Sequence, residues 1–392
     1  MLGLVAVCVR RGAALRLAVL LPPLVVSTET AFAQPAWNEL VVFGDSLSDV
    51  GNVRQRSADL SFGLFVTPDD RYDRGRFSNG PVWIERVADA LGLDASTRSY
   101  RAPGTNYAYG GAVAGTGSSS LTVVRNVGWQ VDEYLLREAR TPTADTLVVL
   151  WAGANDFLNG STNTTGPTDD ILGYLERLYD AGARDFLVPN LPPLGQTPGF
   201  VGVPNAQTQR NANSAAHNTY LNRQLEAFAN TRDARIFTVD VQGLFFDLLE
   251  DPFAFGINDA IIQAINLPAG SDVSDYLFWD DVHPTATGHQ LVADAALAQL
   301  LALTGDYDGD GRVAQGDLNL VLSNWGRDVA ANGAPAGWVG AAPLGTVDQT
   351  ELNGVLGAWG SSAIPDLRGV VVPEPAVVAL LVGAAWSGLR RG

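Results

Sequence analysis

Short apolar runs with strand character alternate with longer helix-like segments through most of the chain. The strand-like runs cover residues 39–43, 146–151, 185–189 and 235–241. The helix-like segments between and after them cover residues 81–91, 130–140, 169–181 and 206–229. Strands that alternate with helices are typical of a parallel sheet with helices on both faces. We therefore expect a three-layer α/β domain whose functional loops follow the carboxyl ends of the strands.

The size and charge of the chain limit the remaining possibilities. With 392 residues, of which 46% are hydrophobic, the chain is long enough for one large core with smaller appendages. Its formal net charge of -17 argues against nucleic acid as a partner, because phosphate binding needs a basic patch and none stands out.

The first 33 residues have the form of a secretory signal. Arginines between residues 10 and 16 precede an apolar run at 17–26, and a small-residue cleavage motif, Ala-Phe-Ala, follows at 31–33. A buried N-terminal helix is the alternative, but a Pro-Pro pair in the run would break it. The single cysteine, Cys8, lies in this segment, so the mature chain would have no thiol and no disulfide. The sequence predicts export.

Residues 367–392 carry a second targeting pattern. Pro-Glu-Pro at 373–375 is followed by an apolar stretch at 376–389 and then by Arg390 and Arg391. This order resembles the PEP-CTERM sorting signal of Gram-negative bacteria, which implies an exosortase-type enzyme as a partner. An ordinary tail anchor is the alternative, although the stretch is shorter than the roughly 20 residues of a spanning helix. Either interpretation predicts the periplasm, the cell surface or the extracellular space, with association to the surface or matrix.

A repeated segment marks a change of organisation near residue 304. The sequences at 318–326 and 352–360 match at Leu, Asn, Val, Leu, Trp and Gly, position for position. Internal duplication of this kind indicates small repeat units separate from the α/β domain. Ahead of the sorting tail we therefore expect a signal peptide, the α/β domain and the repeats, at 1–33, 34–303 and 304–366.

Four short motifs in a fixed order carry the candidate chemistry. They read FGDSLSDVGN at 43–52, NYAYGGA at 106–112, GAND at 153–156 and DDVHPT at 280–285. A serine hydroxyl becomes a good nucleophile only with a base to take its proton and a partner to orient that base. Ser46, in the turn after the first strand-like run, is the candidate nucleophile, and Ser48 is its local competitor. For an isolated serine, a backbone cap would be the alternative.

The base must come from three histidines. His217 lies in a polar helical segment and is most simply a solvated side chain. His289 has no carboxylate at a matching spacing before it, so we interpret it as a helix residue. His283 follows Asp280 by three positions, which lets the carboxylate bind Nδ1 while Nε2 faces the serine. Asp281 is the alternative orienting residue, with a less suitable offset.

Together the four motifs resemble the SGNH hydrolase family, the GDSL lipases and esterases. The resemblance implies a flavodoxin-like α/β/α fold and hydrolysis of esters through an acyl-enzyme intermediate. The implied catalytic residues are Ser46, Asp280 and His283. The oxyanion hole is assigned to the Ser46 amide, the Asn155 side chain and a glycine amide, for which Gly111 is favoured and Gly110 is close behind. Without the other motifs, the glycines would be a plain turn and Asn155 a helix N-cap.

The resemblance extends to segments 75–83 and 189–195 and covers residues 39–300. These segments are most similar to the branch that includes plant GDSL lipases and bacterial phospholipase or haemolysin-like enzymes. The same resemblance implies lipid or short-chain acyl esters as substrates, and no cofactor for catalysis. Aromatic residues that would line the acyl pocket, or else belong to the core, are Tyr72, Phe77, Tyr107, Tyr109 and Phe157.

The repeat region begins with an Asp-rich loop that has the spacing of calcium ligands. Gly311 falls at the sharp turn, and positions 1, 3, 5, 7 and 12 are Asp306, Asp308, Asp310, Arg312 and Asp317. Position 7 contributes only its carbonyl, so an arginine is allowed there. Aspartate at position 12 resembles dockerin repeats, which implies a structural calcium ion, and a solvated Asp-Gly turn is the alternative. The second copy keeps only Asp348 and Glu351, which favours a structural stalk over dockerin-type partner binding.

The sequence as a whole predicts an exported serine esterase or lipase that hydrolyses carboxylic esters of lipid or short-chain acyl type. A carbohydrate acetyl esterase is the alternative within the same chemistry. A different class is a cell-surface or matrix binding protein in which the hydrolase-like domain is secondary. A domain kept only for binding has no need of Ser46, Asp280, His283 and Asn155 together, which disfavours that class.

Overall fold

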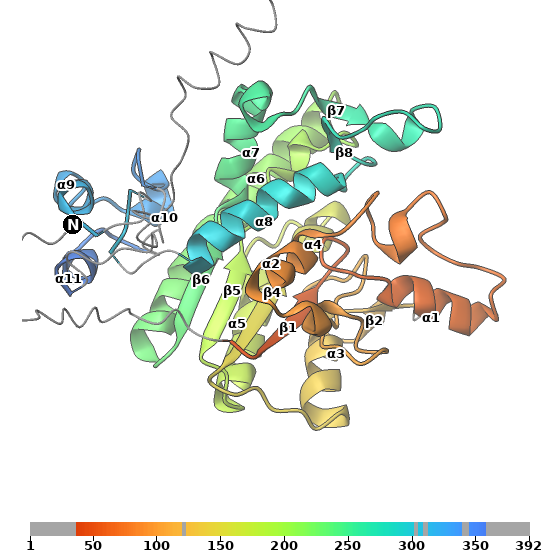
Figure 1. Cartoon of the computed structure of the whole chain (residues 1–392), viewed down its shortest axis with the longest axis horizontal. Coiled ribbons are helices and arrows are strands. Elements are labelled where there is room, and N and C mark those ends of the chain that lie inside the picture. The colour runs from red at the N-terminus through yellow and green to blue at the C-terminus, as the bar shows by residue number, and fades with distance from the viewer. Residues whose placement is uncertain (1–36, 120–122, 302–304, 309–312, 339–344, 358–392) are drawn as a thin grey trace, which may run out of the picture. The chain divides into compact units, whose positions relative to one another are not determined.

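A four-stranded parallel sheet forms the centre of the α/β domain (Figure 1). The computed structural model describes residues 37–119, 123–301, 305–308, 313–338 and 345–357. The strands, in spatial order, are β1 (Glu39–Gly44), β4 (Thr146–Trp151), β5 (Asp185–Pro189) and β6 (Arg235–Val239). All neighbouring pairs are parallel, with Val41 opposite Val148 and Val148 opposite Phe186. The four predicted strands are therefore confirmed, with β6 ending at Val239 rather than at residue 241.

The two faces of the sheet bury alternate side chains of each strand. Leu40 and Leu147 belong to one hydrophobic cluster, whereas the next residues, Val41 and Val148, belong to a second one. This alternation follows from the two-residue repeat of a β-strand, in which successive side chains point to opposite faces. Because both sets are apolar, both faces must be covered by other elements.

Helices cover both faces of the sheet, so the three-layer α/β/α architecture is confirmed (Figure 1). The helices that share the cluster of Leu40 are α2 (Trp83–Leu91), α7 (Val241–Glu250) and α8 (Ala286–Leu301). Those that share the cluster of Val41 are α3 (Val127–Asp132), α5 (Gly166–Asp180) and α6 (Pro204–Thr231). The helix predicted at 130–140 begins earlier, at Val127, and its second half is a π-helical turn, Glu133–Arg137.

Shorter elements complete the domain. The helices are α1 (Asn52–Ser61) and α4 (Ala154–Leu158), each directly after a strand-end turn. The strand pairs are β2 (Ser118–Ser119) with β3 (Val124–Arg125), and β7 (Asp259–Gln263) with β8 (Tyr276–Phe278). Across the described ranges, no helix combines the length and the apolar character needed to cross a bilayer.

The repeat region has a small core of its own. Its helices are α9 (Gln315–Ser323), α10 (Val329–Asn332) and α11 (Gln349–Gly357), and the core includes the matching pairs Val313 with Val347 and Val321 with Val355. The two copies also share a local hydrogen bond. The Asp317 carboxylate accepts from the Ala314 amide at 2.7 Å, and the Glu351 carboxylate accepts from the Asp348 amide at 2.8 Å. The duplication seen in the sequence is thus a duplication of structure.

Candidate active site

Ser46 lies in the turn after β1, at the carboxyl edge of the sheet. Its Oγ is 2.8 Å from Nε2 of His283, and Nδ1 of His283 is 2.7 Å from Oδ2 of Asp280. The structure thus brings together a hydroxyl and an imidazole that are 237 positions apart in the chain. In this arrangement the imidazole can accept the hydroxyl proton while the carboxylate fixes its orientation.

The loop that holds His283 is organised by Asp280. The Oδ1 atom of Asp280 accepts hydrogen bonds from the amides of Val282 at 2.9 Å and His283 at 2.8 Å, and Oδ2 accepts from the Tyr72 hydroxyl at 2.8 Å. Burial alone would raise the pKa of Asp280, but the charge of His283 and the hydrogen bonds from its ring and from the amides of Val282 and His283 outweigh it and lower the pKa to about 2. The carboxylate therefore stays ionised at any pH at which an imidazole titrates. Among the described residues, the alternative orienting residue, Asp281, makes no bond to His283.

A buried carboxylate, Asp49, joins the first two motifs. It accepts hydrogen bonds from the amides of Gly51, Asn52 and Val53, at 2.7, 2.6 and 3.2 Å, and from the Gly110 amide at 2.8 Å. Burial raises its pKa to about 6 against the effect of these amides, so it is largely ionised at neutral pH. The sequence analysis did not assign a role to Asp49, although it lies within the quoted motif.

The hydrogen bond from the Gly110 amide to Asp49 distinguishes Gly110 from Gly111 as the possible oxyanion donor. Because the Gly110 amide already donates to this carboxylate, it is not available to a substrate. The Gly111 amide has no acceptor in the described part of the chain, and Gly111 has φ +80°, a conformation that favours glycine. A Cβ on Gly110 would lie 2.0 Å from the Phe77 ring, so that position needs glycine for packing instead.

Asn155 lies in the first turn of α4, and it is not the N-cap, which is Gly153. Its Nδ2 donates to the Ala112 carbonyl at 3.0 Å and to Oδ2 of Asp45 at 3.3 Å. Burial raises the pKa of Asp45 to about 6, against the lowering effect of the Leu47 amide and of the His283 charge. These bonds hold the Asn155 side chain on the same side of the sheet edge as Ser46.

Ser46, Gly111, Asn155 and His283 line one cavity with a volume of about 520 Å³. Most of the remaining wall is apolar and includes buried members of the domain core: Trp151, Val241, Phe245, Phe278 and Val292. Of the five aromatic residues proposed for a pocket, only Phe77 lines this cavity. Tyr107, Tyr109 and Phe157 are buried in the core, and Tyr72 directs its hydroxyl to Asp280 instead.

The interpretation of His217 as a solvated side chain was wrong. His217 is fully buried, 3.2 Å from the Thr168 hydroxyl, and burial lowers its pKa to about 4. The signal was present in the spacing, because the buried positions of α6 continue the helical stripe of Leu221 and Leu225 toward the N-terminus. His289 lies in α8 as predicted, and its Nδ1 accepts a hydrogen bond from the Trp83 amide at 3.2 Å.

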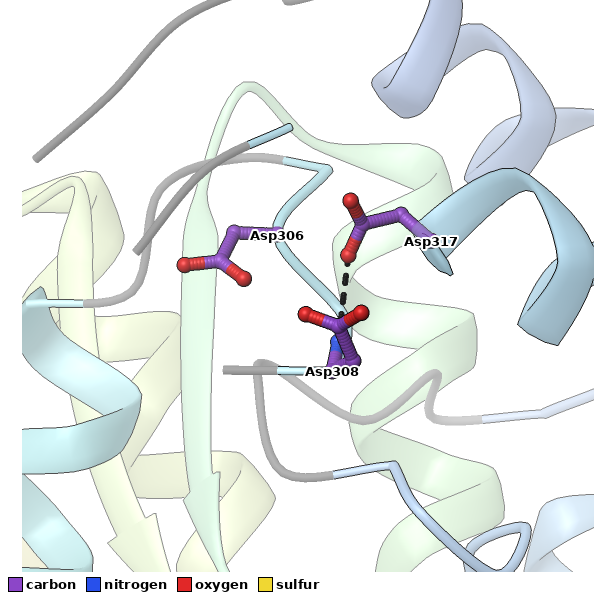
Figure 2. Close-up of side chains that lie close together, drawn as sticks. All are labelled: Asp306, Asp308 and Asp317. Atoms are coloured by element: carbon purple, nitrogen blue, oxygen red, sulfur yellow. Dashed lines mark hydrogen bonds between the residues drawn. The ribbon is translucent and has the colours of Figure 1, made fainter. Parts of the chain in front are cut away.

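The Asp-rich loop of the repeat region gathers carboxylates. Asp306, Asp308 and Asp317 each place an oxygen within 4.8 Å of the others (Figure 2). Asp317 also accepts from the amide of Asp308 at 3.1 Å, which ties the loop to the start of α9. Two further predicted ligands, Asp310 and Arg312, lie outside the described residues. Oxygen ligands of this kind suit calcium, and the described part of the proposed set fits it.

We predict that Asp49→Asn destabilises the domain. The single amide oxygen of asparagine cannot serve four buried amides, and each buried donor left without an acceptor costs about 1–3 kcal/mol. The expected loss is about 2–4 kcal/mol in the free energy of unfolding, measured by urea titration. The exposed Asp89→Asn should change it by no more than about 0.5 kcal/mol. Equal effects of the two substitutions would contradict this account of Asp49.

The chain is similar to known lipases and acyltransferases over most of its length. A family model described as GDSL-like lipase/acylhydrolase matches residues 40–296. A phosphatidylcholine-sterol acyltransferase of Aeromonas hydrophila is 28% identical, over 69% of this chain and 92% of that protein. A thermolabile hemolysin of Vibrio parahaemolyticus is 29% identical, over 69% and 66%. A GDSL esterase/lipase of Arabidopsis thaliana is 26% identical, over 70% and 92%.

The family match spans the sheet, both helical layers and all four sequence motifs. The predicted relation to the GDSL lipases and esterases is thereby confirmed. The dockerin-like repeats and the sorting tail, which lie beyond the matched residues, remain predictions. The chain belongs to the GDSL-like lipase/acylhydrolase family and is a carboxylic ester hydrolase.

Proposed function

We propose that this protein is an exported serine esterase or lipase that hydrolyses lipid acyl esters, with Ser46 as the nucleophile. The observation that carries the proposal is the chain of hydrogen bonds from Asp280 through His283 to Ser46, at 2.7 and 2.8 Å. This chain ends at a cavity with largely apolar walls.

In the proposed reaction, His283 takes the proton of Ser46 as Oγ attacks the ester carbonyl carbon. The amides of Ser46 and Gly111 donate to the oxyanion of the tetrahedral intermediate. The Asn155 side chain joins them by exchanging its longer bond, 3.3 Å to Asp45, for one to the oxyanion. His283 then gives its proton to the leaving alcohol, and an acyl-enzyme remains. Water, deprotonated by the same imidazole, attacks the acyl group and regenerates Ser46 with release of the carboxylic acid. The ionised Asp280 stabilises the imidazolium formed in both halves of the reaction.

The cavity supports a longer acyl chain over an acetyl group. An acetyl group would leave most of about 520 Å³ of largely apolar space unfilled. The names of two relatives, an acyltransferase acting on phosphatidylcholine and a hemolysin, also favour lipid substrates. Carbohydrate acetyl esters remain the alternative, and chain-length preference separates the two.

The first test is hydrolysis of p-nitrophenyl esters from acetate to palmitate. Ser46→Ala should lower kcat/KM by about a thousandfold or more, because the attacking oxygen is removed. Ser48→Ala is the matched control, since the Ser48 hydroxyl accepts from the Trp83 indole at 3.1 Å and should leave activity within about tenfold. An equal loss of kcat/KM in the Ser46→Ala and Ser48→Ala variants would contradict the assignment of Ser46 as the nucleophile. Preference for acetate over longer chains would overturn the lipid substrate and favour the acetyl esterase.

The proposed export rests on residues 1–33 and 367–392, which lie outside the described residues. Arginines followed by an apolar run and a small-residue site at one end, and Pro-Glu-Pro followed by an apolar run and arginines at the other, support it. In this proposal a signal peptidase removes the first segment and an exosortase-type enzyme recognises the last.

N-terminal sequencing and intact mass of the protein from a host with an exosortase-type system test this proposal. We expect a mature chain that begins at Gln34 in the cell envelope or medium. Replacing the Pro-Glu-Pro motif at 373–375 should leave the N-terminus unchanged while altering C-terminal processing or surface attachment. An uncleaved chain in the cytoplasm would contradict the export proposal.

We also propose a structural calcium ion in the loop that begins at Asp306. Three carboxylates within 4.8 Å of one another repel each other strongly, and a divalent cation removes that repulsion. The ion would be held by Asp306, Asp308 and Asp317, with Asp310 and the Arg312 carbonyl completing the predicted set. Catalysis needs no part of this loop in the proposed reaction.

Calorimetric titration of the mature chain should show one bound calcium ion. Asp306→Asn combined with Asp308→Asn should abolish binding, because both substitutions remove a charged ligand. Asp348→Asn, in the second copy, is the control and should leave the stoichiometry unchanged. Ester hydrolysis should be the same with calcium or with EDTA. An absence of calcium binding at millimolar concentration would leave only a solvated turn.

A further inference from the structure

Four large apolar side chains are exposed on the segment that ends α1 and follows it. Leu60, Phe62, Leu64 and Phe65 have exposed fractions of 49, 93, 91 and 60%. We call residues 60–65 the apolar loop. Figure 1 shows α1 and the loop after it reaching away from the sheet, on the side of β1 rather than β6. A soluble domain gains no stability from exposing so many apolar side chains in six consecutive positions.

The backbone of the apolar loop makes this exposure more notable. Phe62 is the C-cap of α1 and has φ 52° and ψ 36°, in the left-handed region. Glycine and asparagine are the residues that suit this position, and a bulky aromatic residue is disfavoured there. Phe62 is 93% exposed, so its side chain contributes little packing in return. Folding alone therefore favours glycine at position 62, and a role outside the fold explains phenylalanine better.

The end of the apolar loop forms part of the wall of the active-site cavity. Phe65 lines the same cavity as Ser46 and His283, and so does Thr67, two residues further on. Because Phe65 is also 60% exposed, it lies where the cavity wall meets solvent, and a surface that binds the apolar loop would lie close to the cavity.

Charged side chains of both signs flank the apolar loop in the sequence. Arg54 pairs with Asp70 at 2.5 Å, and Arg71 pairs with Asp69 at 2.9 Å. Arg74 pairs with Asp73 at 3.8 Å. Such a mixture matches a zwitterionic headgroup layer better than a strongly anionic membrane, which attracts clusters of a single positive sign.

We propose that the apolar loop docks the enzyme on a zwitterionic lipid surface, so that the cavity opens toward the lipid that it hydrolyses. The proposal rests on the lipid esterase function proposed above. Phe62 and Leu64 would insert among the acyl chains, and the paired charges that flank the loop in the sequence would remain at headgroup level. Phe65 would form the boundary between the lipid and the cavity.

The test compares phosphatidylcholine vesicles with a monomeric ester, p-nitrophenyl butyrate. The double variant Phe62→Gly/Leu64→Ser changes two side chains that do not line the cavity. We expect hydrolysis of the monomeric ester within twofold of wild type, and vesicle hydrolysis at least tenfold lower. In a Ser46→Ala background, which does not consume the lipid, vesicle binding by sedimentation should also fall at least tenfold.

A measurement of Tm and a matched control variant test whether misfolding or a general loss of surface hydrophobicity explains weaker vesicle binding. Phe62→Gly alone should keep or raise the Tm, since glycine fits the left-handed cap, while still weakening vesicle binding. The control Leu136→Ser/Phe253→Ser removes two apolar side chains that are 69 and 72% exposed but do not line the cavity. It should bind vesicles as wild type does. Equal loss in the control would show that general surface hydrophobicity, not the apolar loop, drives binding.

A fluorescent label places the apolar loop directly. Cys8 is the only cysteine, so Leu64→Cys in a Cys8→Ser chain gives one labelling site. An environment-sensitive dye there should shift to the blue with vesicles and be quenched by spin-labelled lipid, and a dye at Leu136→Cys should not.

Each outcome separates the docking proposal from the function on which it rests. Ser46-dependent hydrolysis of the monomeric ester without vesicle binding would overturn docking and leave the esterase intact. Loop-dependent vesicle binding without hydrolysis of any ester would do the reverse. Unchanged vesicle binding in the double variant would overturn docking and make a protein partner the better occupant of the apolar loop.

Discussion

The buried carboxylate of Asp49 is the point on which the active-site edge depends. It collects the free amides at the start of α1 and the amide of Gly110, which belong to segments some sixty positions apart. Asn52 reinforces this link by donating to the carbonyls of Asn106 and Ala108, at 3.0 and 2.8 Å. Without these bonds, several buried backbone groups would lose their partners at once. The turn that carries Ser46 and the segment that carries Gly111 are therefore held as one unit.

The other half of the site depends on a short loop with one long-range support. Asp280 binds the amide and the ring of His283, three positions away, so the relative placement of these two residues is set locally. Tyr72 then adds a hydrogen bond to Asp280 from a segment 208 positions distant. Local hydrogen bonds hold Asp280 and His283 together. Hydrogen bonds with Tyr72 and Ser46, which are distant in the sequence, position both residues relative to the sheet.

The sequence was sufficient for the architecture and for the residues gathered at the sheet edge. The runs 39–43 and 146–151 are apolar at successive positions because alternate side chains of each strand are buried on opposite faces of the sheet. The motifs at 43–52 and 280–285 meet in the structure through Ser46 and His283, and short motifs in a fixed order constrain a site more than any single residue does.

The remaining features depend on contacts between distant segments, which composition does not encode. His217 is buried because α6 packs its polar-looking stripe against the domain; residue type alone pointed to the surface, and only the helical spacing to Leu221 and Leu225 indicated burial. The choice between Gly110 and Gly111 required knowing that Asp49 accepts from the first of them. The cavity walls come from β4, α7, β8 and α8, and no local pattern shows that these elements leave a space between them.

The close packing of Gly110 against Phe77 links the residue type at position 110 to the shape of the cavity wall. A side chain at position 110 would occupy the space of the Phe77 ring, and Phe77 forms part of the cavity wall beside His283. A larger residue at 110 therefore requires the Phe77 ring to move or to be replaced by a smaller side chain, and either change would reshape the cavity. A change at position 110, beside the proposed oxyanion donor, is therefore also a change in the shape of the acyl site at this point.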